Sequence, residues 1–446
     1  MMHFCKARMI FIAVFIFLVF STAGIAVAGD RELTLEKAID TALRNNRDVL
    51  IAEEKLKQTK GAKQEAFAGF LPKINLMSYA SQKNNVDIPD EFKAAMGKDF
   101  TAMLANKAYD MQLSLQQPIF TWGKLLNSNE NARLNYLLAR ESYRKSKSEL
   151  VFNVKKAYFG VMLAKKLVSI AEEMSAVAES HFKVTGSFYK QGKISAYDVS
   201  KAKVQMTNAK TGLLTVRNAE HLSLEGLFNI MGREIDENVV LTTEMDYKPV
   251  TLDYEGYIKE AITMRPELES LELQEKMLKV LVNLNRASNK PSLVFTGYVD
   301  WIQSVDEFND ISANINDWYR TWNTRLVLNY SLFDGFATRA KVLQSKAQLR
   351  QVNIGRDQLT SGIKMELRQI CFTLKQFQEI LAGQKENVEV ARENLKIAEE
   401  RYGKGLVSDI EVRDAQLALN QAGKDYYQAL NDYNVSLAAL DKALGK

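Results

Sequence analysis

Residues that could carry catalytic or metal chemistry are few in this sequence and lie far apart. It contains three histidines and two cysteines, of which His181, His221 and Cys371 lie beyond residue 28. None has the spacing of a metal site or of a nucleophile with its general base, and no phosphate-binding Walker loop is present. We interpret His181 as a surface residue rather than a ligand, and Cys371 as a small apolar residue on a helix. The sequence therefore predicts a protein that is not an enzyme and has no metal or cofactor.

One pair of carboxylates has a spacing that could act on ions. Glu411 and Asp414 are separated so that both lie on one face of a helix. Carboxylates attract cations and repel anions over about 8 Å, the Debye length at physiological salt. An ordinary solvated helix face carries similar charges, so both interpretations stand at this point.

The N-terminus has the pattern of an export signal. A basic start is followed by an uncharged apolar run at 9–20 and by small residues up to Ala28. This predicts a signal peptide at 1–28 and a mature chain of 29–446. The formal net charge of the whole chain is +5, with 59 basic and 54 acidic residues, which is too balanced to indicate a nucleic-acid partner. Beyond the signal, no apolar stretch approaches the roughly 20 residues of a spanning helix.

The remaining sequence contains one unit twice, at 31–235 and 250–446, joined by a linker at 236–250. Residues early in the first copy have counterparts in the second, as Pro72 has in Pro291. Residues later in the first copy have counterparts at a shorter interval along the chain. Loops of different length are therefore expected at 83–106 and 303–319. The later correspondence is carried by Tyr189, Gly192, Ser195, Val199 and Ala202 against Tyr402, Gly405, Ser408, Val412 and Ala415.

Each copy contains two segments in which apolar and polar residues alternate, which is strand behaviour. The four strands are predicted near 71–83, 110–121, 291–303 and 321–334. Each has roughly the length that a tilted membrane strand requires. The four tryptophans lie in or beside these segments: Trp122, Trp301, Trp318 and Trp322. Because tryptophan concentrates at membrane interfaces, we interpret them as an interfacial belt; the alternative is tryptophans clustered in core strands.

Each copy continues into a long helix, near 123–188 and 336–401, and a return helix. Apolar residues in the long helices step by four and three over five heptads, which predicts a coiled-coil seam. The first seam is Leu150, Val154, Ala157, Val161, Ala164, Val168, Ala171, Ser175, Ala178, Phe182, Thr185 and Tyr189, and the second occupies the matching positions from Ile363 to Tyr402. At the tips, Gly192 and Gly405 stand where helices would end, and Ser195 and Ser408 where the next would begin.

Four strands cannot close a sheet in lipid, because two edges would stay unpaired. The chain must therefore oligomerise if it lies in a membrane. Three copies would give a twelve-stranded β-barrel, although the residues alone do not exclude a dimer.

Two features resemble the outer-membrane efflux protein family of TolC-like channels. One is the pattern at the second tip, which runs from Arg401-Tyr402 through Gly405, Ser408 and Glu411 to Gln416. The other is the duplicated order of a strand pair followed by a helix hairpin. The resemblance covers about 31–445. It implies a mainly α chain forming a homotrimer, whose twelve-stranded transmembrane barrel in the outer membrane continues into a long helical coiled-coil tunnel in the periplasm. It also implies a passive exit duct of a tripartite efflux pump or type I secretion system, working with a periplasmic adaptor and an inner-membrane RND or ABC transporter.

The resemblance also implies roles for particular residues. Glu411 and Asp414 match the family's selectivity ring, and Asp198, Lys201 and Tyr402 match its gate contacts. The hairpin tips at Gly192, Ser195, Gly405 and Ser408 match the region where the adaptor docks. The arginine that such channels carry near the second tip is replaced here by apolar residues around Leu406 and Val407, which departs from the family's pattern at the latch.

Two other classes of protein share part of this pattern. A periplasmic coiled-coil adaptor or scaffold without a pore would need the helices but not the two strand pairs. A simple porin would need many more strands and few long helices. The sequence does not indicate which cargo is exported.

Overall fold

The computed structural model describes residues 32–82, 91, 107–236, 238–305, 308–404 and 406–446. The predicted signal peptide, most of the loop predicted at 83–106, and Gly405 lie outside these residues. The chain divides into two compact units, each made of segments from both sequence copies. The sheet unit comprises Arg44–Phe152, Pro249–Glu379 and Ser436–Lys446, and the tip unit comprises Met1–Leu43, Asn153–Lys248 and Ile380–Val435.

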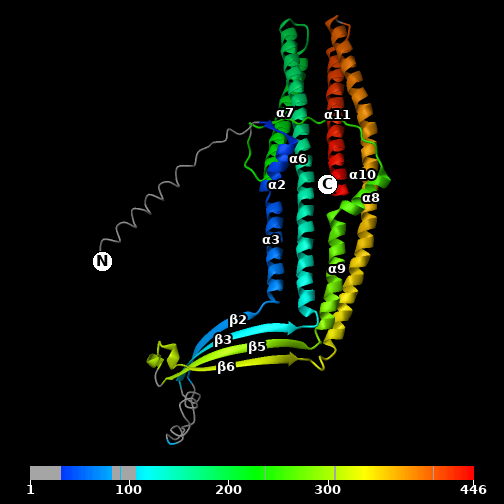
Figure 1. Cartoon of the computed structure of the whole chain (residues 1–446). Helices are drawn as coiled ribbons and strands as arrows, with labels where there is room; N and C mark the ends of the chain where they lie inside the picture. The colour runs from blue at the N-terminus through cyan, green and yellow to red at the C-terminus, as the bar shows by residue number, and fades with distance from the viewer. Residues whose placement is uncertain (1–31, 83–90, 92–106, 237, 306–307, 405) are drawn as a thin grey trace, which may run out of the picture. The chain divides into compact units, whose positions relative to one another are not determined.

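Four antiparallel strands form the sheet of the sheet unit, in the order β2-β3-β5-β6 (Figure 1). They are β2 (Lys73–Gln82), β3 (Lys107–Phe120), β5 (Ser292–Val305) and β6 (Tyr319–Asn329). β5 extends into the loop predicted at 303–319, which also contains the short 3-10 helices Phe308–Asp310 and Ile315–Asp317. β6 ends at Asn329, earlier than the predicted end of that strand at 334.

The early end of β6 follows from its partner strand, because Asn329 pairs with Ser292, the first residue of β5. A separate feature of the backbone follows this end. Before each long helix the chain passes through two successive residues with positive φ, Trp122 (50°) and Gly123 (79°) in the first copy and Gly335 (62°) and Phe336 (64°) in the second. Positive φ is costly for an aromatic residue and cannot continue a strand. In the second copy the Thr338 N–H then donates to the Asp334 carboxylate at 3.0 Å, where the next helix starts.

The register of the sheet gathers its apolar side chains on one face. Leu76 lies opposite Leu113, and Leu113 lies opposite Val299 on the next strand. Val299 in turn lies opposite Trp322, and Phe295 opposite Leu326. The other face is polar, as the hydrogen bond of 2.7 Å from the Gln112 amide to the Asp300 carboxylate shows. Apolar side chains of β2 and β6 are exposed: Ile74, Leu76, Trp322, Leu326 and Leu328.

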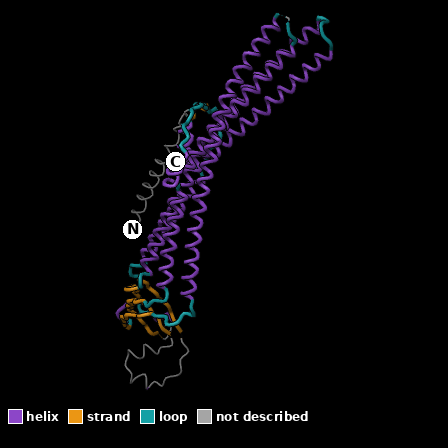
Figure 2. Tube along the Cα trace, turned by 90° about the vertical axis from the view of Figure 1, so that its right-hand side faces the viewer, coloured by secondary structure: helices purple, strands orange, loops and turns teal. Residues whose placement is uncertain are grey.

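The helices repeat in the order expected from the duplication. Helices α2 (Leu35–Asn45) and α3 (Arg47–Ala68) of the first copy recur in the second as α8 (Tyr254–Met264) and α9 (Pro266–Ala287). Helices α6 (Lys124–Lys190) and α7 (Ala196–Met231) recur as α10 (Ala337–Gly403) and α11 (Asp409–Leu444). Within the sheet unit, α3, α9 and the first parts of α6 and α10 adjoin the sheet (Figure 1), and Figure 2 shows helices extending from the sheet in a second view. In the described residues, none of the helices combines the length and the apolar character needed to cross a lipid bilayer.

The predicted coiled-coil seams lie inside the helix packing. In both series only the last member, Tyr189 or Tyr402, is exposed. Val154 and Val161 of the first series and Leu367 and Leu374 of the second are fully buried. Spacing by four and three therefore identified the buried stripe of both long helices.

A small parallel sheet in the tip unit was not predicted. Strand β1 (Glu32–Leu33) pairs with β4 (Val240–Leu241), which lies within the segment predicted as a linker at 236–250. The fully buried Tyr158 of α6 holds both segments: its hydroxyl donates to the Leu33 carbonyl at 2.9 Å and accepts from the Thr243 N–H at 3.0 Å. Such short strands leave no alternating pattern, so the sequence carries no signal for this sheet.

Candidate functional site

Two helix hairpins, α6–α7 and α10–α11, end in turns of the same design. In the first turn Gly192 has φ of 73°, and the Lys193 N–H donates to the Phe188 carbonyl at 3.0 Å. In the second, the Leu406 N–H donates to the Arg401 carbonyl at 3.0 Å, which is the same hydrogen bond at the matching position of the second copy. This six-to-one bond closes a helix whose next residue is left-handed, so glycine at 192 avoids strain there.

Ser195 and Asp198 form a capping box at the start of α7. The Asp198 carboxylate accepts from the Ser195 N–H at 3.1 Å and from its hydroxyl at 2.7 Å, and the Ser195 hydroxyl accepts from the Asp198 N–H at 3.3 Å. These bonds to Ser195 hold the pKa of Asp198 below its ordinary value. Asp198, predicted as a gate contact, thus has a structural partner in its own helix.

Replacing Ser195 with alanine is expected to loosen the first turn of α7. Loss of an N-cap serine costs about 1 kcal/mol, so amide hydrogen exchange over residues 196–199 should accelerate about fivefold. Hydrogen exchange followed by mass spectrometry measures this, with Ser187→Ala as the control, because the Ser187 hydroxyl bonds within α6 to the Lys183 carbonyl. Unchanged exchange in Ser195→Ala would contradict the capping assignment.

The same cap predicts a pH dependence with a definite sign. Because the folded pKa of Asp198 is lowered from 3.8, its stabilising effect is complete above that value and is lost as the pH falls through the folded pKa. Protection of the first turn of α7, corrected for intrinsic exchange, should fall in that acidic window in the natural chain. The Ser195→Ala variant should lose most of this pH dependence.

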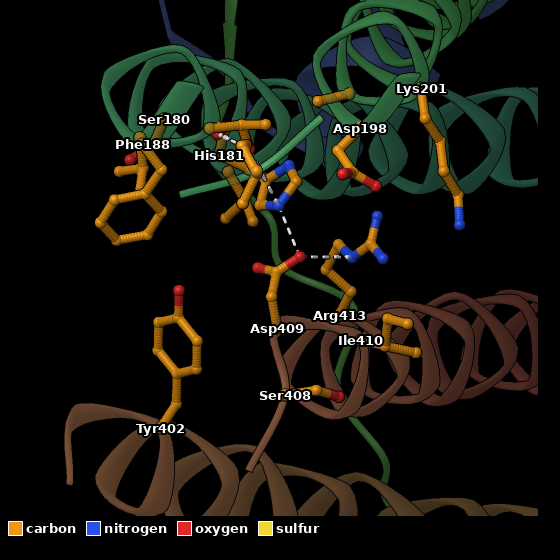
Figure 3. A pocket seen from close by; sticks show the side chains of 15 residues that line it. Ser180, His181, Phe188, Asp198, Lys201, Tyr402, Ser408, Asp409, Ile410 and Arg413 are labelled. Atoms are coloured by element: carbon orange, nitrogen blue, oxygen red, sulfur yellow. Dashed lines mark hydrogen bonds and ion pairs between the residues drawn. The ribbon is translucent and has the colours of Figure 1, made fainter. Parts of the chain in front are cut away.

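A cavity of about 590 Å³, here called the tip cavity, is lined by residues of α6, α7, α10 and α11 in the tip unit (Figure 3). Four residues singled out from the sequence line it: Asp198, Lys201, Tyr402 and Ser408. Gly192 and Ser195 are in the adjoining turn. Asp414 lines a second cavity of about 560 Å³ between α6, α7 and α11. Glu411 and Asp414 are both exposed on α11.

Three residues that sequence reasoning missed form the polar centre of the tip cavity. His181 Nε2 lies 2.5 Å from Asp409 Oδ2, and Arg413 Nε lies 3.1 Å from the same oxygen (Figure 3). Arg413 Nη1 donates to Gln205 Oε1 at 2.5 Å. The interpretation of His181 as a surface residue is wrong, because only 19% of its side chain is exposed.

The sequence contains a local signal for part of this cluster. Asp409 and Arg413 are one helical turn apart, which is the spacing of an ion pair on one helix. His181 precedes the seam residue Phe182, so it lies at the edge of the buried stripe. Its partner Asp409 belongs to the other copy of the duplicated unit, and no local pattern could connect the two.

The tryptophans lie toward opposite ends of the sheet. Trp122 follows the end of β3, where α6 begins, and is half exposed. Trp318 and Trp322 lie at the opposite end of the sheet, at the start of β6. Trp301 of β5 lies near the same end. Trp322 is 73% exposed on the apolar face, whereas the Trp318 ring N–H donates to the Ser312 carbonyl at 3.1 Å.

Groups suited to metal or thiol chemistry are sparse in the described residues. Across them, no cluster of three or more His, Cys, Asp or Glu side chains is arranged to hold a metal ion. Cys371 is half-buried, and burial raises the pKa of its thiol, which lowers the thiolate fraction that a nucleophile would need.

Comparison with known proteins agrees with this architecture. The profile of the family described as outer membrane efflux protein matches residues 38–233 and 257–446. The probable efflux pump outer membrane protein TtgC of Pseudomonas putida is 23% identical over 415 residues, covering 92% of this chain and 82% of TtgC. The alkaline protease secretion protein AprF of Pseudomonas aeruginosa is 22% identical over 336 residues, covering 75% of this chain and 69% of AprF.

Solved structures share the fold. The Campylobacter jejuni CmeC outer membrane channel superposes with a TM-score of 0.78 at 17% identity, covering 92% of this chain and 85% of CmeC. The outer membrane protein VceC of Vibrio cholerae superposes with a TM-score of 0.71 at 17% identity, covering 92% and 96%. The predicted fold class, a mainly α channel protomer with four strands, is thereby confirmed. The family profile spans both copies of the duplicated unit, and this chain belongs to the outer membrane efflux protein family.

Proposed function

We propose that this chain is the outer-membrane exit duct of a tripartite efflux pump or type I secretion system, built as a homotrimer and without enzymatic activity. The observation that carries the proposal is the sheet, which has one exposed apolar face and ends in β2 and β6, each paired on one side only among the described strands. Such a sheet is unsuited to water on its apolar face and to lipid at its edges.

Association of identical chains answers both problems. If β6 of one protomer pairs with β2 of the next, three copies form a closed sheet of twelve strands with no free edge. The apolar face then meets lipid, and the polar face, which carries Gln112 and Asp300, lines a water-filled lumen. Tryptophans toward both ends of the sheet suit the two membrane interfaces.

The helices supply the rest of the duct in this proposal. Each long helix has 67 residues, about 100 Å at 1.5 Å per residue, enough to extend well beyond a bilayer. The hairpin turns at Gly192 and Ser408 are the surfaces offered to a periplasmic adaptor and, through it, to an RND or ABC transporter that supplies energy. The names of the relatives, an efflux pump protein and a protease secretion protein, support both kinds of system. An adaptor without a pore would leave the apolar sheet face unexplained.

Placing arginine on the apolar face should abolish assembly, whereas the same change on the polar face should not. Leu326 and Asn323 are exposed on opposite faces of β6. Arginine facing the bilayer midplane costs about 2–4 kcal/mol in membrane strands, and a trimer carries it three times. We expect Leu326→Arg to reduce heat-modifiable trimers in outer-membrane fractions by at least about tenfold.

Asn323→Arg is the matched control and should leave trimer yield near that of the natural chain. Planar-bilayer recordings of the purified trimer should show large conductance steps. A natural chain that stays monomeric and never enters bilayers, or equal trimer yields for the two variants, would overturn the proposal.

A further inference from the structure

We propose that the second cavity, between α6, α7 and α11, binds a small uncharged molecule that has an apolar body and an amide or related carbonyl group. All the residues that line this cavity belong to the tip unit, and binding there does not depend on the proposed channel function. The volume of about 560 Å³ falls within the roughly 300–1,000 Å³ that small-molecule sites occupy.

Small side chains leave the space between these helices. Ala171 of α6 and Ala209 and Gly212 of α7 line the cavity. The positions equivalent to Ala171 and Gly212 in the second copy are Gln384 and Asp425, and the second hairpin is formed nevertheless. A helix hairpin of this kind therefore does not require small residues at these two positions, and the hollow is a feature of this particular place in the tip unit.

Larger apolar side chains form the walls of the second cavity. Met174 of α6 and Leu213 of α7 are half-buried along it. Val177 of α6 and Leu417 of α11 also line it, and they are 38% and 55% exposed. A molecule with an apolar body would remove this surface from water, which favours binding through the hydrophobic effect.

Two buried amides of α11 give the cavity a polar floor. Gln416 and Asn420 lie one helical turn apart, line the cavity and are each 7% exposed. The Gln416 Nε2 donates to Asn420 Oδ1 at 3.2 Å. Among the residues that the structure describes, the buried Asn420 Nδ2 finds no acceptor. Because an unpaired buried donor is costly, a ligand carbonyl that accepts from Asn420 would be strongly preferred over an apolar group at the same place.

The charged groups around the cavity favour a ligand without formal charge. Lys201 of α7 and Asp414 of α11 both line it and have opposite charges. The Arg413 side chain also lines it, and its charge is paired with Asp409 at 3.1 Å. A charged ligand group would lose its hydration beside Asn420 without gaining a buried ion of opposite charge there. The class of ligand is therefore a neutral amphipathic amide or related carbonyl compound.

Disulfide tethering tests the site, because it detects weak ligands that bind beside an introduced thiol. The thiol is introduced by Leu417→Cys in the purified full-length protein, in a Cys371→Ala background. One probe is an aryl amide that carries a disulfide, and the other is its analogue with CH2–CH2 in place of CO–NH. Both compete with β-mercaptoethanol, and mass spectrometry of the intact protein gives the ratio of modified to unmodified chains. We expect this ratio to be about tenfold higher for the amide probe.

Leu214→Cys is the matched control, because Leu214 is 61% exposed on α7 beside the residues that line the cavity, and its thiol should not prefer the amide probe.

Adding Asn420→Leu to Leu417→Cys removes the donor at similar side-chain volume and should abolish the preference for the amide. Equal modification of Leu417→Cys by the two probes, or a preference that persists with Asn420→Leu, would overturn the site. A thiol that neither probe modifies would show that another copy of the chain covers the cavity, and this result would overturn the site as well. If Asn420→Leu does not fold, the comparison of the two probes on Leu417→Cys and Leu214→Cys decides.

Discussion

Replacing Glu411 and Asp414 together with alanine is expected to reduce the cation-to-anion permeability ratio of the channel about tenfold. Both carboxylates are exposed on one face of α11, in the first turns after the hairpin tip. In a trimer they would bring six negative charges around one axis, within a Debye length of about 8 Å of any ion passing the constriction. If they form the ring implied by the resemblance, removing them would lower the local excess of cations and weaken block by divalent ions.

Reversal potentials in a KCl gradient, together with block by added Mg²⁺, measure the effect in planar bilayers. Glu386→Ala with Glu389→Ala is the matched control, because this pair has the same spacing and is exposed on α10 of the same unit. The control should leave ion preference unchanged. Equal selectivity in the Glu411/Asp414 variant and the natural channel would show that these carboxylates form an ordinary solvated face.

Replacing Tyr158 with alanine is expected to destabilise the tip unit by about 3–5 kcal/mol, as truncation of a fully buried aromatic residue does. The phenol is fully buried and bonds to Leu33 and Thr243 at once. Its loss leaves a cavity and leaves two backbone groups without their hydrogen-bond partner, each at a cost of about 1–3 kcal/mol. The β1–β4 pairing should open before the long helices do.

Thermal unfolding followed by circular dichroism measures the overall loss, and hydrogen exchange at residues 32–33 and 240–243 localises it. Tyr158→Phe keeps the ring and removes only the hydroxyl, so it should show the local opening with a smaller drop in melting temperature. Tyr197→Ala, on the exposed surface of α7, serves as the control. If Tyr158→Ala has the same melting temperature as the control, this account of the two-strand sheet is refuted.

The repeated architecture was predictable because its signals are local and occur twice. The seam in α6 and α10 follows from spacing by four and three, and the faces of β5 and β6 follow from alternation along each strand. Gly192 and Ser195 marked the end of one helix and the start of the next, since each residue type meets a local backbone need. Recurrence of these residue types at a constant interval then linked the two copies.

The structure decided what depends on distant partners or on backbone strain. The end of β6 follows from its partner strand, because Asn329 pairs with the first residue of β5, Ser292. Phe336 has positive φ, and an aromatic residue gives no warning of this in the sequence. The β1–β4 pair depends on Tyr158, which is distant in the chain from both strands.

The sequence by itself determined the period, the element types and the buried stripes of this protein, because these arise from the repeat of one residue type along one helix or strand. Only the tertiary structure decided that His181 meets Asp409 and that the Asp198 carboxylate bonds to Ser195 at the start of its own helix. An ion pair between hairpins depends on two helix positions that folding brings together, and the sequence around either position does not indicate its partner.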